Sequence, residues 1–129
     1  MFLLIVLSPV MQVGNLSARR DFTDVRDMTR AYGLALEHCE PGRAYNIASG
    51  NVRSVQQLLD ILLDLSRVNV TVKVNPELVR AASTPALMAD CSRFRARTGW
   101  QPEIPFDQTL SDLLNYERDR FRTRTKEQA

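Results

Sequence analysis

The chain has 129 residues, of which 44% are hydrophobic and 25% are charged, a composition typical of one soluble globular domain with a single core. The 17 basic and 15 acidic residues are interspersed along most of the chain and leave a formal net charge of +2. A nucleic-acid-binding protein would carry a clustered basic excess, so we expect no nucleic-acid partner.

The apolar segment MFLLIVL, residues 1–7, has no preceding positive charge and is too short to span a bilayer. We therefore expect residues 1–12 to form an apolar N-terminal strand or the remnant of a longer element, without membrane association. Cys39, Cys91 and the single histidine, His38, lack partners at metal-ligand spacing. These features favour a reducing, cytoplasmic setting, no metal site, and a histidine at a helix end or on the surface.

In chain order, residues 10–14 read as a strand that ends at the Gly14-Asn15 turn. Apolar residues then recur at steps of three and four, which predicts a helix that Thr23 or Asp24 can cap and that ends by Pro41-Gly42. The expected buried face of this helix consists of Val25, Met28, Tyr32, Ala35, Leu36 and Cys39.

Residues 43–48 read as a short strand, and Ser54 with Gln57 forms a capping box that starts a second helix. The expected buried stripe of that helix is Val55, Leu58, Leu59, Leu62 and Leu65. Valines then alternate with polar residues over 67–74, which places all four valines on one face of a strand.

Asn75-Pro76 predicts a short capped turn, and residues 81–85 predict a loop. A short helix is expected from Asp90 to Arg97, ended by Gly99. Asp107 is expected to cap a final helix, followed by a charged, solvated and fraying tail at 118–129. Alternating strands and helices of this length predict an α/β fold in which a small sheet is covered by helices.

Two signatures of nicotinamide-dependent enzymes are missing from the chain. Its five glycines occur singly, whereas a dinucleotide-binding turn needs clustered glycines so that the backbone can approach the pyrophosphate. No tyrosine is followed four residues later by lysine, the pair in which an ammonium lowers the pKa of a phenol. We therefore expect neither catalytic residues nor a cofactor site in this chain.

Four motifs occur in an order that resembles extended short-chain dehydrogenases acting on nucleotide sugars. They are VGNLSARRDFTDVRD (13–27), RAYNIASG (43–50), Arg80 and TGWQP (98–102). The group that they resemble is that of GDP-mannose 4,6-dehydratase and GDP-4-keto-6-deoxymannose reductase. The resemblance implies a C-terminal substrate-binding subdomain at 13–117, without the Rossmann domain that binds NADP or NAD in the complete enzymes.

The resemblance also implies four substrate-binding residues. Arg20 would pair with the diphosphate of the nucleotide sugar through its guanidinium fork, although it could instead be a surface charge bonded to Asp24 or Asp27. Arg80 would approach the diphosphate and ribose from the opposite side. Ser83 stands where the family usually has glutamate, which weakens the expected ribose contact. Asn15 matches an asparagine of the family's glycine-asparagine-leucine turn and could bind ligand or only form the turn.

These features predict a catalytically silent part of a GDP-mannose dehydratase-like enzyme that binds a GDP-mannose-type nucleotide sugar. A reductase or epimerase of the same superfamily is an alternative. A non-enzymatic remnant or interaction domain is another, because losing the Rossmann partner would expose apolar surface. The expected partners are accordingly the nucleotide sugar and either a separate Rossmann-domain chain or a second copy of this chain.

Overall fold

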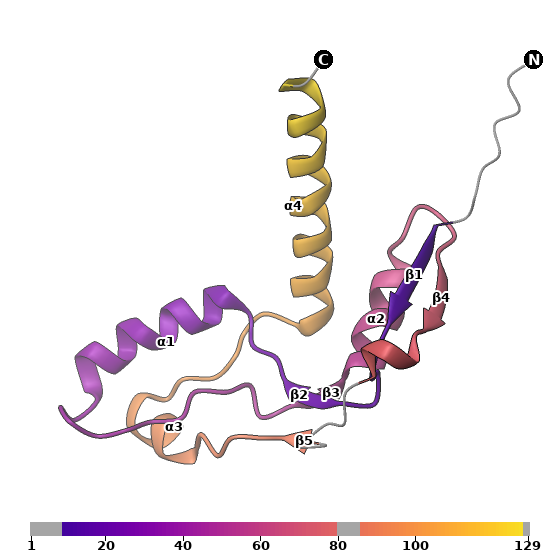
Figure 1. Ribbon diagram of the computed structural model, residues 1–129. Coiled ribbons are helices and arrows are strands. Elements are labelled where there is room, and N and C mark those ends of the chain that lie inside the picture. Colours follow the sequence, from indigo (N-terminus) through magenta and orange to yellow (C-terminus); the bar gives the residue numbers. More distant parts are fainter. Residues whose placement is uncertain (1–8, 80–85, 128–129) are drawn as a thin grey trace, which may run out of the picture.

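The computed structural model describes residues 9–79 and 86–127, and within these ranges it has two small sheets and four α-helices (Figure 1). In chain order the elements are β1 (Val10–Val13), β2 (Arg19–Asp21), α1 (Val25–His38), β3 (Val52–Ser54), α2 (Val55–Asp64), β4 (Thr71–Val74), the 3-10 helix η1 (Pro76–Leu78), β5 (Ala86–Leu87), α3 (Ser92–Thr98) and α4 (Phe106–Glu127). The predicted α/β class is confirmed.

The strands form one parallel pair and one three-stranded sheet. In the pair, β1 runs parallel to β4, with Val10 opposite Thr71 and Val13 opposite Val74. In the second sheet the order is β3–β2–β5, with β3 antiparallel and β5 parallel to the central strand. The motif around Arg20 therefore lies in the middle of a sheet, with a neighbouring strand on each side.

The aromatic core lies between α1 and α3. Ala31, Phe94 and Trp100 are buried, and the rings of Phe94 and Trp100 meet edge to face with centroids 5.9 Å apart. Such an arrangement brings the positive edge of one ring to the negative face of the other. The predicted burial of Trp100 is confirmed, with 1% of its surface exposed.

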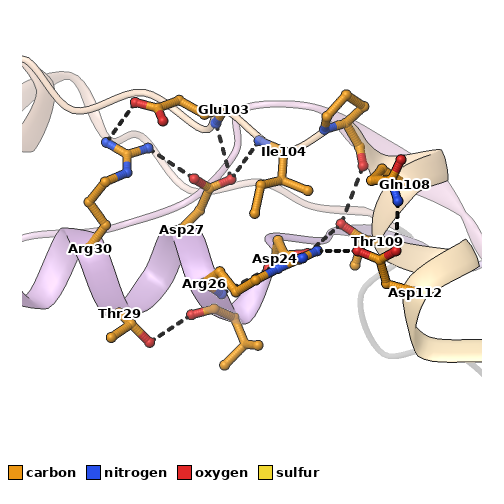
Figure 2. A network of polar contacts seen from close by, with 12 residues as sticks. Asp24, Arg26, Asp27, Thr29, Arg30, Glu103, Ile104, Gln108, Thr109 and Asp112 are labelled. Atoms are coloured by element: carbon orange, nitrogen blue, oxygen red, sulfur yellow. Dashed lines mark hydrogen bonds and ion pairs between the residues drawn. The ribbon is translucent and has the colours of Figure 1, made fainter. Parts of the chain in front are cut away.

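Two aspartates attach the first turns of α1 to the segment that leads into α4 (Figure 2). Asp27 accepts the backbone N–H groups of Glu103 and Ile104 at 3.1 and 3.0 Å. Asp24 caps the helix and accepts the hydroxyl of Thr109 at 2.7 Å. Because these groups are buried or half-buried, the bonds fix the path of a proline-rich connector that has no regular structure of its own.

The predicted capping box at the start of α2 is confirmed, because Ser54 and Gln57 each accept the other's backbone N–H. Helix α2 packs against α4, with Leu59 and Leu110 buried. Figure 1 shows the C-terminal part of α4 extending away from the sheets.

The strand predicted at 43–48 is wrong, since the backbone there has no strand assignment. Tyr45 and Ile47 do pack against the aromatic core, so the apolar alternation correctly marked an inward face. A strand also needs a neighbour to share its ladder, and no strand within residues 9–79 and 86–127 pairs with this segment.

Two apolar faces are smaller than the sequence predicted. The strand β4 covers only Thr71–Val74, and among the four valines Val68 and Val74 are exposed while the other two are half-buried. In α1 the structure exposes 74% of Val25, 58% of Tyr32 and 90% of Leu36. Helical periodicity predicted that these three side chains are buried, and that prediction is wrong, because the described elements do not cover them.

The final helix begins earlier than predicted. Phe106 is its first residue, so Asp107 lies inside the first turn and does not cap it. An acidic side chain there still interacts favourably with the positive end of the helix dipole. The segment predicted as a charged tail is helical as far as Glu127, and the described side chains from Asp119 onward are exposed.

Several other predictions concern the ends of helices and the loops. Asp24, Asn75 and Gly99 end or begin helices as expected, and His38 is the last residue of α1. The N-terminal apolar segment 1–7 and the loop at 81–85 lie outside the described residues, and the three-part domain division stays a prediction. In the part of the chain that is described, no helix has the length and apolar character needed to cross a bilayer.

Candidate functional site

Arg20, the predicted diphosphate ligand, occupies the middle of the central strand β2. Its partners in register are Arg53 on the antiparallel strand β3 and Leu87 on the parallel strand β5. The side chain is half-buried, and Nη1 donates to the carbonyl of Arg19 at 2.6 Å. Residues directly opposite each other in an antiparallel pair project from the same face of the sheet, so Arg20 and Arg53 are neighbours on one face.

On the opposite face of β2, Asp21 holds the turn at Ser49 and Gly50. Asp21 accepts the backbone N–H and hydroxyl of Ser49 at 3.0 and 2.6 Å, and the N–H of Gly50 at 2.7 Å. Arg95 donates to the carbonyl of Ser49 at 2.7 Å. Gly50 adopts φ +81°, which favours glycine. Asp21 thus has a structural role, and the side chains of Arg20 and Arg53 project from the other face.

A cleft of about 360 Å³ lies beside Arg53, where α4 begins. Phe22 and Phe106 both line it, with ring centroids 5.6 Å apart, and the Arg53 guanidinium carbon lies 4.8 Å from the Phe106 ring centre. This distance permits a cation–π interaction, which holds the cation beside the cleft. The sequence reasoning missed Arg53, because its position opposite Arg20 depends on strand register.

Asn15 forms the turn that follows β1. Its Oδ1 accepts the backbone N–H of Ser17 at 2.9 Å and the Ser17 hydroxyl at 2.7 Å, which is an Asx-turn arrangement. The same loop is attached to the start of α2, where Gln56 N–H donates to the carbonyl of Leu16 at 2.9 Å. The turn-forming role of Asn15 is therefore confirmed, while its contact with a ligand stays a prediction.

Arg80 and Ser83 lie outside the described residues, but the structure places both flanks of their segment. On the N-terminal flank, Val79 and Asn15 line one hollow of about 510 Å³. On the C-terminal flank, Ala86 pairs with Arg19 in β2. Val79 thus lies beside the Asn15 turn, and Ala86 lies beside the strand that carries Arg20.

Glycine is required at position 14 for this arrangement. A Cβ atom there would overlap the carbonyl oxygen of Leu78 and lie 2.9 Å from its carbonyl carbon. The backbone after β1 and the backbone of η1 are therefore in direct contact. Asn75 strengthens the same junction, because its N–H donates to the carbonyl of Val13 at 2.9 Å.

The acidic residues near the cleft are largely neutralised. The Arg26 guanidinium bonds both carboxylate oxygens of Asp24 and holds the pKa of that carboxyl well below its ordinary value. Burial opposes this lowering of the pKa, and the hydrogen bond from Thr109 adds to it. Burial alone would raise the pKa of Asp27, but hydrogen bonds from Ile104 N–H, Arg30 and Glu103 N–H outweigh it and lower the pKa. Both carboxylates are thus ionised, and Asp24 pairs with Arg26 while Asp27 pairs with Arg30.

A profile of the family described as GDP-mannose 4,6 dehydratase matches residues 4–113. The chain belongs to this family. This match confirms the prediction from the four motifs that the chain resembles the C-terminal part of such enzymes.

Members of the GDP-mannose 4,6-dehydratase family and related enzymes match most of this chain. It is 33% identical over 112 residues to a GDP-6-deoxy-D-mannose reductase of Pseudomonas aeruginosa, covering 87% of this chain and 37% of that protein. It is 24% identical over 132 residues to the GDP-mannose 4,6 dehydratase of Homo sapiens, covering 86% and 35%. The solved structure of RMD from Pseudomonas aeruginosa, complexed with NADPH, superposes with a TM-score of 0.77 at 31% identity, over 85% of this chain and 35% of that one. The chain thus spans little more than a third of the length of these relatives.

Neither Gly14 nor Gly50 fits a dinucleotide-binding turn. Gly14 packs against Leu78, and the N–H of Gly50 is bonded to Asp21, so neither offers a backbone cradle to a pyrophosphate. Within residues 9–79 and 86–127 no group of three or more histidine, cysteine, aspartate or glutamate residues is placed to hold a metal ion.

Proposed function

We propose that this chain binds a nucleotide sugar of the GDP-mannose type and that Arg20 is its principal ligand for the diphosphate. The observation that carries the proposal is the place of Arg20, half-buried at the centre of a sheet and facing the same side as a second arginine. A guanidinium fork held in this way can give two parallel charge-assisted hydrogen bonds to phosphate oxygens. The similarity of this chain to a GDP-6-deoxy-D-mannose reductase and to a GDP-mannose 4,6 dehydratase supports a GDP-linked sugar as the ligand.

The remaining predicted ligands complete this proposal. Arg80 would contact the diphosphate from the side opposite Arg20, Ser83 would bond a ribose hydroxyl, and Asn15 would offer its amide to the nucleotide. The positions of the two flanking residues, Val79 beside Asn15 and Ala86 beside Arg19, support a common site.

The activity of the whole protein is part of the proposal. In a complete enzyme NADP or NAD would oxidise and re-reduce the sugar, as the NADPH complex of the Pseudomonas protein suggests. This chain alone would bind no dinucleotide and would be catalytically silent. Dehydratase, reductase and epimerase activities are all compatible with the substrate-binding residues. The free cysteines Cys39 and Cys91 fit a reducing, cytoplasmic setting.

Isothermal titration calorimetry with GDP and GDP-mannose tests the binding proposal. We expect saturable heat for both ligands with the unaltered chain, and loss of at least about 1.5 kcal/mol of binding free energy in Arg20→Ala. Arg19→Ala is the matched control, because Arg19 is adjacent in sequence but projects from the other face of β2. No heat at millimolar ligand, or equal binding by Arg20→Ala and the unaltered chain, would refute the proposal.

The exposed apolar residues of α1 support a second candidate function, that of an interaction domain. Val25, Tyr32 and Leu36 recur at helical spacing and are mostly exposed, and large exposed apolar patches often mark protein interfaces. The partner would be a separate Rossmann-domain chain or a second copy. Sedimentation velocity of the purified chain over a range of concentrations distinguishes self-association from a monomer that awaits a different partner.

A further inference from the structure

We infer that Arg53 is a second guanidinium ligand of the diphosphate, acting together with Arg20. The inference rests on the proposed function and adds a binding residue to the same site. It assigns to β3, a strand outside the four predicted ligand positions, a direct role in recognising the anion.

The first argument is strand register. Arg20 and Arg53 are direct partners across the antiparallel pair β2–β3. The Cβ atoms of such partners are separated by about 4.5–5.5 Å, and both side chains project from one face. Two guanidinium groups therefore start from adjacent points of a rigid scaffold. A diphosphate has two phosphoryl groups next to each other, so each arginine can bond one of them.

The second argument is electrostatic. Like charges directly opposite each other on a sheet are destabilising unless an anion or a nearby carboxylate balances them. Among residues 9–79 and 86–127, no carboxylate lies within ion-pair distance of Arg53. A bound diphosphate would supply the anion that balances the charge of Arg53, which makes its place opposite Arg20 favourable in the complex.

The third argument is the aromatic support of Arg53. Its guanidinium carbon lies 4.8 Å from the centre of the Phe106 ring, at the edge of the 360 Å³ cleft. The N–H donors of a guanidinium point outward in its own plane, so contact with a ring face restrains the group without using its donors. Restraint before binding lowers the entropy lost when the ligand is bound.

The acids beside the cleft do not oppose this role. Asp24 is paired with Arg26, and Glu103 is paired with Arg30 at 3.2 Å. Asp107, exposed in the first turn of α4, is the remaining carboxylate that lines the cleft. Arg53 offsets that single charge, and Arg20, its partner in register, adds a second positive charge on the same face of the sheet.

The test measures the affinity of the full chain for GDP and for inorganic pyrophosphate in four variants: Arg53→Met, Arg53→Lys, Phe106→Leu and the control Arg19→Met. We expect Arg53→Met to bind both ligands about tenfold more weakly, which corresponds to about 1.4 kcal/mol. Lysine keeps the charge but loses the fork, so Arg53→Lys should give an intermediate affinity. The Arg19→Met variant should match the unaltered chain.

Phe106→Leu separates the aromatic support from the ligand role, because it removes the ring beside Arg53 and keeps the Arg53 guanidinium. A direct ligand role requires Arg53→Met to lose more affinity than Phe106→Leu. It also requires a weaker dependence of GDP affinity on salt in Arg53→Met, since one cation has left the site. If Arg53→Met binds GDP within about twofold of the unaltered chain while Arg20→Ala does not, Arg53 is no ligand and the proposed function stands. If the unaltered chain binds neither ligand, the proposed function falls, and this inference with it.

Discussion

The indole N–H of Trp100 donates to the backbone carbonyl of Asp27 at 3.1 Å, 73 residues away in the sequence. The side chain of the same aspartate binds the backbone that follows the tryptophan (Figure 2). Asp27 and Trp100 therefore connect α1 to the connector before α4 from both sides. The short proline-rich connector is fixed by these bonds and by the buried ring.

The carboxylate of Asp27 should be a main determinant of stability. It is 2% exposed and accepts hydrogen bonds from Glu103 N–H, Ile104 N–H and Arg30. Asp27→Asn replaces one acceptor by a donor that faces N–H groups, and leaves the Arg30 guanidinium without its closest carboxylate. We expect a loss of about 3 kcal/mol in the free energy of unfolding, measured by urea denaturation.

Asp119→Asn is a suitable control for that measurement. Asp119 is exposed on α4 and pairs with Arg122 three residues later at 3.3 Å. Exposed pairs of this kind contribute little, so its removal should change the unfolding free energy by less than about 0.5 kcal/mol. Equal effects of the two substitutions would contradict the role given to Asp27.

The indole hydrogen bond itself can be tested with Trp100→Phe. The ring stays apolar, but the Asp27 carbonyl loses its donor in a buried site and some volume is left empty. We expect a loss of about 2 kcal/mol, followed by circular dichroism because Trp100 is the chain's single tryptophan. Stability unchanged within error would show that this bond is not important for the fold.

Acid should destabilise the protein through Asp24 and Asp27. Both have a folded-state pKa below the unfolded value of about 3.9, so the unfolded chain binds more protons as the pH falls through this range. Their contribution is present above about pH 4 and is lost progressively below it. Urea titrations at pH 7, 4 and 3 should show this decline, and Asp24→Asn should show a smaller decline than the unaltered chain. An equal decline in both proteins would contradict the pKa of Asp24.

Sequence reasoning predicted most features that depend on nearby residues. The Ser54–Gln57 capping box, the Asn75 cap and the left-handed Gly99 are each determined within a few residues of chain, and the structure contains all three. Arg20 and Asn15 were identified from a motif, and the structure supplies the sheet centre and the turn that hold them.

Features that depend on distant neighbours were not predictable in this way. Residues 43–48 have strand-like alternation, yet strand formation depends on a partner that periodicity does not reveal. The outward positions of Tyr32 and Leu36 likewise depend on which elements cover α1. Arg53 was missed for the same reason, because only the β2–β3 register makes it the neighbour of Arg20.

Alanine should have opposite effects on stability at Gly14, which contacts Leu78, and at Gly33. At Gly14 an added methyl group meets the Leu78 carbonyl, so Gly14→Ala must displace backbone and should lose about 2 kcal/mol of stability. Gly33 lies inside α1 with no neighbouring heavy atom within 4 Å of an added Cβ. There alanine lowers the entropy cost of helix formation, so Gly33→Ala should gain about 0.5–1 kcal/mol.

The same pair of variants also tests the ligand site. Gly14→Ala shifts the backbone that leads to Asn15 and the backbone of η1 that leads to Val79, so it should weaken GDP binding more than its loss of stability explains. Gly33 is not among the residues proposed to form the site, so Gly33→Ala should leave GDP affinity unchanged. Calorimetry at a temperature where both variants are fully folded separates the two effects. If Gly14→Ala binds GDP as the unaltered chain does, the junction of β1 with η1 supports the fold alone, and the Asn15 turn is no part of the binding surface.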